Sequence, residues 1–386
     1  MVFNAAWITT FNTMPTTGSP TMILMNDFRA EPEALQQQQI AAAERVLRSG
    51  WYVLGNEVKT FEATWAERCG VGFAVGVGNG MDAIEIGLRA IGIGAGDEVI
   101  TTPMTAFATV LAVIRAGATP VLADIDPETA LLDPLSVERC LSSRTKAVLL
   151  VHLYGQVKAM PQWVALCADK GIHLLEDCAQ AHLASWQGNV AGSFGTWGAY
   201  SFYPTKNLGA VGDGGALVTD TAVIAQQAQM LRNYGQSQRY QHPELGLNSR
   251  LDELQAALLS VRLGWLEEFT ARRRQIAHAY YSGIENPSIQ LLAQPLSKES
   301  HVHHLFVIRC DQRERLSTYL TENGVSNLSH YPIPIHHQQP CQDIQRDPQG
   351  LPQAETHAVQ CLSLPCHPQM SDRDIAHVIE VINDFK

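Results

Sequence analysis

Residues 201–209 read Ser-Phe-Tyr-Pro-Thr-Lys-Asn-Leu-Gly, and this stretch decides how the rest of the chain is interpreted. It begins in an apolar run that predicts a β-strand and ends in a turn that contains Pro204 and Gly209. Lys206 therefore stands where a strand gives way to a turn. An amine in such a position is partly removed from water, which lowers its pKa and makes it a nucleophile. A lone lysine after a strand is more simply explained as a surface residue. Whether Lys206 is catalytic therefore depends on what the neighbouring segments of the sequence indicate.

A second apolar run, Ile172-His-Leu-Leu-Glu-Asp, predicts a strand whose last residue is Asp177. Open α/β sheets bind their ligands at the carboxyl ends of the strands. A carboxylate that faces a pyridine nitrogen keeps that nitrogen protonated, which makes the ring an electron sink. Taken alone, Asp177 is equally well interpreted as a helix cap.

The third segment is the glycine-rich turn Gly76-Val-Gly-Asn-Gly-Met-Asp-Ala, which follows a predicted strand and precedes a predicted helix. Such a turn presents free N–H groups and the positive end of a helix to a phosphate. The signal is weak by itself, and Asp82 in the first helical turn is simply explained as a cap. A phosphate cradle, a strand-end acid and a strand-end lysine are nevertheless the three parts that a pyridoxal phosphate site needs.

Short apolar runs alternate with helical patterns along most of the chain, which predicts an α/β fold. Strands are expected over 73–77, 98–101, 120–124, 147–152 and 172–177, with a late pair at 197–203 and 215–219. We expect residues 1–24 to be a disordered extension, or else the result of a mis-assigned start with Met22 or Met25 as the true one. A large cofactor-binding domain is expected over 25–285 and a small C-terminal α/β domain over 286–386, because proline and polar residues interrupt the pattern near Asn286.

Composition excludes several classes of function. Asp and Glu number 38 against 27 Lys and Arg, a net charge of −11, which argues against nucleic acid or an anionic membrane as the partner. The densest basic cluster, Arg272 to Arg274, is interpreted as a solvated helix face. The eight scattered cysteines form no C-x-x-C pair, which favours reduced thiols in the cytoplasm. The N-terminal residues lack the features of a signal peptide, and no apolar stretch approaches the roughly 20 residues of a membrane helix.

With these segments in place, the chain resembles the DegT/DnrJ/StrS family of pyridoxal-phosphate-dependent sugar-nucleotide aminotransferases from about Asp27 to the C-terminus. The motifs that carry the resemblance are Gly92-Ile-Gly-Ala-Gly-Asp-Glu-Val-Ile, Val151-His-Leu-Tyr-Gly-Gln, Glu176-Asp-Cys-Ala-Gln-Ala-His, Phe202-Tyr-Pro-Thr-Lys-Asn-Leu-Gly-Ala-Val-Gly-Asp-Gly-Gly, Gly246-Leu-Asn-Ser-Arg-Leu-Asp-Glu and Leu362-Ser-Leu-Pro. So many long matches in register leave little room for chance.

The resemblance implies a fold-type I transferase and a role for each matching residue. Lys206 would carry pyridoxal 5'-phosphate as a Schiff base, Asp177 would pair with the pyridine nitrogen and Gln180 would lie near the ring hydroxyl. The further residues that it implies are Gly80, Met81 and Ser201 for the phosphate, Asn248 or else Arg250 for the phosphate of a partner subunit, and His330, Tyr331 and His336 for the sugar pocket. No metal is expected.

The same resemblance implies a ping-pong transfer of an amino group from an amino acid, L-glutamate above all, to a keto sugar nucleotide. The product would serve amino-sugar, polysaccharide (lipopolysaccharide) or glycoside biosynthesis, and the enzyme would be a homodimer with shared active sites. The turn Asn79-Gly-Met-Asp resembles members that act on 3-keto sugars, here a 3-keto-deoxyhexose. Two positions depart from the family: Met81 replaces a hydroxyl residue at the phosphate, and Ala106 replaces an aromatic residue over the ring, for which Phe107 is a candidate replacement.

Three rivals are weighed against this interpretation. A pyridoxal phosphate sugar dehydratase of the same family carries histidine in place of the lysine, whereas Lys206 is present. A non-catalytic sensor with this fold has no need of the lysine, the acid and the glycine turn together. A nicotinamide dehydrogenase is disfavoured because Gly76-x-Gly-x-Gly lacks the G-x-G-x-x-G spacing and no acidic strand end follows about 20 residues later.

Overall fold

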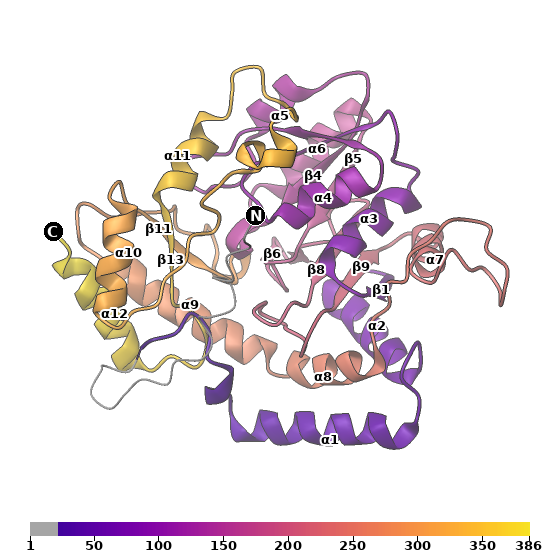
Figure 1. Ribbon diagram of the computed structural model, residues 1–386, viewed down its shortest axis with the longest axis horizontal. Coiled ribbons are helices and arrows are strands. Elements are labelled where there is room, and N and C mark those ends of the chain that lie inside the picture. Colours follow the sequence, from indigo (N-terminus) through magenta and orange to yellow (C-terminus); the bar gives the residue numbers. More distant parts are fainter. Residues whose placement is uncertain (1–21) are drawn as a thin grey trace, which may run out of the picture.

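A computed structural model describes residues 22–386, and its ribbon is shown in Figure 1. Residues 1–21, which hold most of the extension expected over 1–24, lie outside the described residues. Ile23 is buried, and its N–H donates to the carbonyl oxygen of Gly324 at 2.8 Å in a bridge to Val325. The described chain therefore begins against its own C-terminal part. Within residues 22–386, no helix combines the length and the apolarity needed to cross a membrane.

The larger part of the molecule is built on one sheet. Its strands are β1 (Phe73–Val77), β2 (Glu98–Thr101), β3 (Thr119–Leu122), β4 (Thr145–Val151), β5 (His173–Asp177), β8 (Trp197–Ser201), β9 (Gly215–Thr219) and β12 (Gln345–Arg346). They lie in the order β1-β9-β8-β5-β4-β2-β3-β12. The pairs from β8 to β12 are parallel, whereas β9 is antiparallel to both β8 and β1. The mostly parallel sheet expected of a fold-type I transferase is confirmed.

Helices cover both faces of this sheet. They are α1 (Glu33–Ser49), α2 (Asn56–Cys69), α3 (Gly80–Ala90), α4 (Phe107–Arg115), α5 (Pro134–Cys140), α6 (Met160–Lys170), α7 (Ala222–Leu231) and α8 (Glu253–Leu263). Because successive strand residues point to opposite faces, Leu174 of β5 lies in the core shared with α2, α5, α6 and α8, and Leu175 in the core shared with α3, α4 and α7. Helix α1 runs along the outside against α8 (Figure 1).

The C-terminal part has a core of its own. Its helices are α9 (Leu266–Gly283), α10 (Arg313–Glu322), α11 (Pro352–Gln360) and α12 (Asp372–Asp384), and its antiparallel sheet joins β10 (Gln290–Leu291), β11 (Phe306–Arg309) and β13 (Cys361–Leu364). Apolar side chains of α9, α10, α12 and this sheet form one buried cluster. Strand β12 nevertheless pairs with β3 of the large sheet, so a division at residue 286 stays a prediction.

The remaining elements are short. A hairpin joins β6 (Ser185–Trp186) to β7 (Asn189–Val190), and 3-10 turns occur at Phe28–Ala30, Leu153–Gly155, Lys298–Ser300, Ile335–His337 and Gln339–Cys341. All eight cysteines are buried and free of disulfides.

The interpretation of Arg272 to Arg274 as a solvated helix face is wrong for Arg273. This residue lies on α9, is only 6% exposed and donates from Nη1 to the carbonyl oxygens of His303 (3.4 Å), His304 (3.3 Å) and Cys366. Burial lowers the pKa of its guanidinium. Consecutive helical residues point about 100° apart, so a run of three cannot share one face, and the sequence pattern does not reveal which of them points inward.

The motif at residues 246–253 has a structural role at its last residue. The carboxylate of Glu253 accepts hydrogen bonds from the N–H groups of Gly55 (2.8 Å), Glu57 (3.0 Å) and Val58 (3.0 Å). These N–H groups belong to the first turn of α2 and have no partner within the helix, so Glu253 caps α2 from α8. A Cβ atom on Gly55 would lie 2.6 Å from Oε2 of Glu253, so the close approach requires glycine at residue 55.

Candidate active site

The predicted lysine lies directly beyond the end of β8. Its N–H donates to the carbonyl oxygen of Tyr203 at 2.8 Å, which closes the turn, and within residues 22–386 its amine forms no hydrogen bond or ion pair. Burial lowers the pKa of Lys206 to about 8, and the nearby carboxylate of Asp177 opposes part of that change. About one tenth of the amine is therefore unprotonated at pH 7, far more than for an ordinary lysine, and this is the form that attacks a carbonyl carbon.

The histidines around this amine are held neutral. Burial, with a smaller contribution from the charge of Lys206, lowers the pKa of His182 to about 3 and that of His330 to about 4. The pKa of His304 is likewise lowered well below its usual value, for the same two reasons. The amine therefore has imidazoles near it without additional positive charge.

Asp177 is the last residue of β5 and is 6% exposed. Its Oδ1 accepts from the N–H of Ala179 at 3.1 Å, and its Oδ2 accepts from the hydroxyl of Thr109 at 2.8 Å. Hydrogen bonds to a carboxylate stabilise its charged form, which offsets the cost of burial. Both carboxylate oxygens are thus held by hydrogen bonds at the carboxyl edge of the sheet, where the sequence predicts a partner for a pyridine nitrogen.

Gln180 follows Asp177 and is held at both ends of its amide. Its Oε1 accepts from the N–H of Tyr154 at 2.6 Å, and its Nε2 donates to the hydroxyl of Tyr331 at 3.2 Å. This pattern fixes which end of the amide carries the N–H groups and leaves the second of them for another acceptor. A ring hydroxyl beside the cofactor aldehyde is such an acceptor.

The predicted phosphate cradle packs against β8. Helix α3 begins at Gly80, with Asn79 as its N-cap: the Asn79 side-chain oxygen accepts from the N–H of Asp82 at 2.9 Å. A Cβ atom on Gly80 would lie 2.6 Å from Cβ of Ser201, so the helix start and the Ser201 strand end approach closely only because residue 80 is glycine. Backbone N–H groups at a helix start and a hydroxyl beside them suit a phosphate. Met81 offers its N–H here, not a side-chain donor.

Asn248 and Arg250 lie on either side of an anchor. Ser249 between them is buried, and its hydroxyl accepts from the N–H of Gly78 at 3.0 Å, in the glycine-rich turn. Asn248 is exposed, and its side-chain oxygen accepts from Arg250. Arg250 also donates to Asn233 at 3.0 Å and stacks on the ring of Tyr234. The segment is therefore fixed to its own chain through Ser249 while the Asn248 side chain faces outward.

The residues expected in the sugar pocket do not all lie together. Nδ1 of His330 bonds to the hydroxyl of Ser363 at 2.8 Å, and the Tyr331 hydroxyl reaches Gln180 as described. His336 is buried, and its Nε2 lies 3.0 Å from Oε1 of Glu355 on α11. The structure thus brings His330 and Tyr331 to Lys206 and Gln180, whereas His336 is engaged with α11. Its contact with a sugar stays a prediction.

The two departures from the family pattern lie on different helices. Met81 is in the first turn of α3, and Ala106 is the N-cap residue of α4. Phe107, the first residue of α4, is 36% exposed, so it keeps a free ring surface. Its role as a replacement for the missing aromatic residue stays a prediction.

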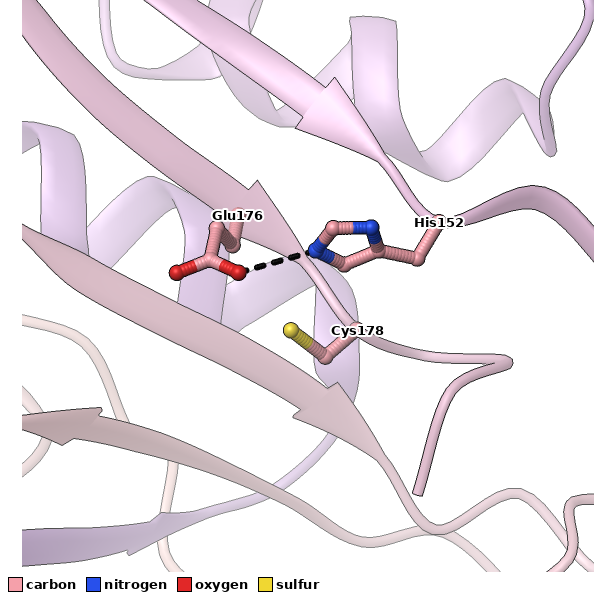
Figure 2. Close-up of side chains that lie close together, drawn as sticks. All are labelled: His152, Glu176 and Cys178. Carbon is pink, nitrogen blue, oxygen red and sulfur yellow. Dashed lines mark hydrogen bonds and ion pairs between the residues drawn. The ribbon is translucent and has the colours of Figure 1, made fainter. Parts of the chain in front are cut away.

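His152, Glu176 and Cys178 form a buried cluster behind this edge of the sheet, shown in Figure 2. Glu176 accepts from Nε2 of His152 and from the N–H groups of Gly192, Phe194 and Gly195, at 2.8 to 2.9 Å. Each of its oxygens already accepts two hydrogen bonds, which leaves no free lone pair for a metal ion. Burial raises the pKa of the Cys178 thiol well above its usual value. We describe the cluster as a hydrogen-bonded support for the strand end that carries Asp177.

Sequence reasoning missed Thr109 and Tyr154, which hold Asp177 and Gln180. Tyr154 stands inside a quoted motif, but its contact to Gln180 is made by a backbone N–H, which any residue except proline supplies. Thr109 and Asp177 are 68 residues apart, and their contact depends on which strand follows which in the sheet. The weak signal available was the pair of hydroxyls at Thr105 and Thr109, one helical turn apart in an otherwise apolar segment.

These residues fit pyridoxal phosphate. The donor set comprises an amine with a lowered pKa, a buried carboxylate, an oriented amide and a helix start at which a Cβ atom would close the cradle. Each group matches one part of that cofactor: the aldehyde, the pyridine nitrogen, the ring hydroxyl and the phosphate.

Comparisons with known proteins agree with this fit. The model of the DegT/DnrJ/EryC1/StrS aminotransferase family matches residues 33–383. The chain is 43% identical to the dTDP-3-amino-3,4,6-trideoxy-alpha-D-glucose transaminase of Streptomyces venezuelae, over 93% of this chain and 95% of that protein. It is 44% identical to the dTDP-3-amino-3,6-dideoxy-alpha-D-galactopyranose transaminase of Aneurinibacillus thermoaerophilus, over 94% and 99%. The crystal structure of S. venezuelae DesV in complex with a ketimine intermediate matches with a TM-score of 0.91 and 42% identity, covering 95% of this chain and 98% of DesV.

Proposed function

The chain belongs to the DegT/DnrJ/EryC1/StrS aminotransferase family, and we propose that it aminates carbon 3 of a keto-deoxyhexose carried on dTDP. It is a sugar-nucleotide aminotransferase that depends on pyridoxal phosphate, as its resemblance to the family implied. The observation that carries the proposal for the site is the partly desolvated amine of Lys206 beside the buried carboxylate of Asp177.

Each residue of the proposed site has a distinct task. When bound, pyridoxal phosphate supplies a carbonyl group that holds the amino group and a ring that accepts electrons while a proton moves. Lys206 would hold the cofactor through its neutral amine, and once the substrate's amino group had displaced it, the freed amine would take up and return the proton that moves on the substrate. Asp177 would hold the ring nitrogen in its protonated form, and Gln180 would hold the ring through its hydroxyl. The N–H groups of Gly80 and Met81 and the hydroxyl of Ser201 bind the phosphate.

Two features support carbon 3 as the position that receives the amine. Both relatives named above are transaminases whose names specify a 3-amino sugar on dTDP. The turn Asn79-Gly-Met-Asp, which resembles that of family members acting on 3-keto sugars, forms the start of α3 against Ser201. A nearby Tyr331 and a neutral His330 offer polar atoms suited to sugar hydroxyls.

The rival functions lack such support. A sugar dehydratase of this family needs histidine where Lys206 stands. A non-catalytic sensor would have no use for an amine whose pKa is lowered to about 8 beside a buried acid.

The proposal extends to the amino donor, the assembly and the location. L-Glutamate is the proposed donor, and the enzyme is proposed to be a cytoplasmic homodimer, a location that the eight free cysteines support. The outward-facing Asn248, next to an anchor on the glycine-rich turn, supports a phosphate contact made across a dimer interface, where amide and guanidinium groups are strong donors. The apolar side chains of Trp51, Tyr52 and Leu245 are 62%, 53% and 88% exposed, which suits an interface with a second copy.

A substrate panel tests the proposed specificity. The purified holoenzyme is assayed with L-glutamate and dTDP-linked 3-keto and 4-keto 6-deoxyhexoses, and with a UDP-linked 3-keto sugar, by measuring 2-oxoglutarate and the mass of the amino sugar. We expect kcat/KM for the dTDP-linked 3-keto sugar to exceed the others by about tenfold or more, because the pocket must bind the reacting carbon over Lys206. Faster reaction of the 4-keto sugar would refute the position, and faster reaction of the UDP sugar would refute the nucleotide.

A further inference from the structure

We propose that Thr109 is a positioning residue for Asp177, held in its donating orientation by the hydroxyl of Thr105. The three side chains form a buried chain that runs from the start of α4 to the end of β5. The inference rests on the proposed function, because it concerns the carboxylate assigned there to the ring nitrogen.

The contacts fix the direction of the hydrogen bonds. The Thr109 hydroxyl lies 2.8 Å from Oδ2 of Asp177, and an ionised carboxylate only accepts, so Thr109 donates. A hydroxyl has one proton, so Thr109 has none left for Thr105, whose oxygen lies 2.7 Å away. Thr105 must therefore donate to Thr109. The exposed fractions of 4% for Thr105 and 1% for Thr109 leave little room for water to replace either donor.

The hydrogen-bonded hydroxyls of Thr105 and Thr109 fix the orientation of the Asp177 carboxylate, which its other contact does not. The other carboxylate oxygen is held by the N–H of Ala179 in the next turn, so that contact alone would let the group rotate about a single bond. Thr109 holds the second oxygen from a different element, α4, and so fixes the plane of the carboxylate.

A purely structural role is the competing explanation. Hydroxyl groups of threonine in a first helical turn often bond locally, and Thr105 and Thr109 are four residues apart. A local role accounts for the bond between them but not for the bond to Asp177, which joins residues 68 apart. The two explanations differ in what they predict for the ring nitrogen, since only the positioning role changes its protonation.

The test compares four variants by two measurements. Thr109→Val keeps the shape and removes the donor, Thr109→Ser keeps the donor, Thr105→Val removes only the outer hydroxyl, and Asp177→Asn serves as the reference. The first measurement is the 15N chemical shift of the ring nitrogen in enzyme loaded with 15N-labelled pyridoxal phosphate. The second is kcat and KM for the keto sugar, with the cofactor dissociation constant measured by equilibrium dialysis.

We expect Thr109→Val to lower kcat about 10- to 100-fold, the loss that corresponds to a hydrogen bond to a charged group, with KM unchanged. Its ring-nitrogen shift should move toward that of Asp177→Asn, Thr105→Val should move it less, and Thr109→Ser should restore it. If the ring-nitrogen shift is that of wild type in Thr109→Val but changed in Asp177→Asn, the inference about Thr109 is wrong and the role proposed for Asp177 stands. An unchanged shift in Asp177→Asn would overturn the role proposed for Asp177 itself. If Thr109→Val fails to fold, Thr105→Val decides. A wild-type ring-nitrogen shift in Thr105→Val would refute the proposal that Thr105 orients Thr109 toward Asp177.

Discussion

Asp177 and Gln180, at the ring end of the proposed cofactor site, are each held by two hydrogen bonds from their own chain, whereas Asn248, at the phosphate end, faces outward. The ring end draws on β5, α4 and the turn at Tyr154, and its side chains are buried or nearly so. In the segment 248–250, which is expected to reach a partner's phosphate, only Ser249 is buried, and its hydroxyl accepts from the N–H of Gly78. One end is thus organised within one chain, and the other presents groups that a second chain can use.

This difference predicts that substitutions at the two ends of the site affect different properties of the enzyme. Side chains that are pre-oriented by neighbours need little reorganisation when charge develops, which favours the chemical step. Groups at an open end contribute chiefly to holding the cofactor and to joining subunits. Variants at the ring end should therefore affect turnover, and variants at the phosphate end should affect cofactor occupancy and depend on the partner.

The largest effect is expected from removing the amine. Lys206→Ala loses both the group that binds the cofactor carbonyl and the group that moves the proton, so kcat should fall by about three orders of magnitude or more. Lys206→Arg keeps a positive charge but cannot lose its proton at neutral pH, and it should fall as far. Single-turnover and steady-state assays with L-glutamate measure both variants. Turnover within a few-fold of wild type in either variant would show that Lys206 is not the amine that binds the cofactor.

A smaller loss is expected from Asp177→Asn. The amide keeps the shape but not the charge, so the ring nitrogen loses its proton and the barrier rises by about 3 kcal/mol or more. The cofactor should still bind through Lys206 and the phosphate cradle, so its absorbance band should persist at the wild-type enzyme concentration. An unchanged kcat would mean that the carboxylate only closes the turn to Ala179.

The rate of cofactor binding should rise about tenfold for each pH unit below 8. The pKa of Lys206 is lowered to about 8 from its ordinary value of 10.5, so the neutral amine becomes the major form above about pH 8. Stopped-flow absorbance of cofactor-free enzyme mixed with pyridoxal phosphate should give a rate that rises about tenfold per pH unit below 8 and levels off above it. A rate that keeps rising toward pH 10 would mean that the amine is solvated as on a surface. Stability rises with pH in the same window: between those two values the unfolded chain binds more protons, so the free-energy cost of burying this amine falls as pH rises from about 8 to 10.5.

The ring end was largely predictable, because its main residues stand at the ends of apolar runs. Ile172 to Asp177 predicted a strand, and the structure has His173–Asp177 in the centre of a mostly parallel sheet. The parallel arrangement brings such strand ends to one edge, so Asp177 and Lys206 meet as expected of a ligand-binding edge. The carboxylate and the amine could thus be paired from sequence.

What could not be predicted depends on contacts between elements that are distant in sequence. Thr109 reaches Asp177 only because α4 packs on the sheet in the core that also holds Leu175 of β5. Arg273 points inward because its guanidinium binds the carbonyl oxygens of His303 and His304, which lie 30 and 31 residues further along the chain. Strand β12 joins the large sheet although it lies beyond the break in pattern near residue 286. A strand of two residues carries no alternation that a sequence can reveal.

Complementation between two inactive enzymes tests most directly whether one chain completes the ring end and a second chain completes the phosphate end. Lys206→Ala subunits are mixed with subunits carrying both Asn248→Ala and Arg250→Ala, exchanged under conditions shown to produce heterodimers, and assayed at limiting pyridoxal phosphate. A heterodimer has one site with both lesions and one with neither, so a 1:1 random mixture should recover about one quarter of wild-type activity. No recovery despite proven exchange would contradict the account, because each site would then draw Lys206, Asn248 and Arg250 from the same chain.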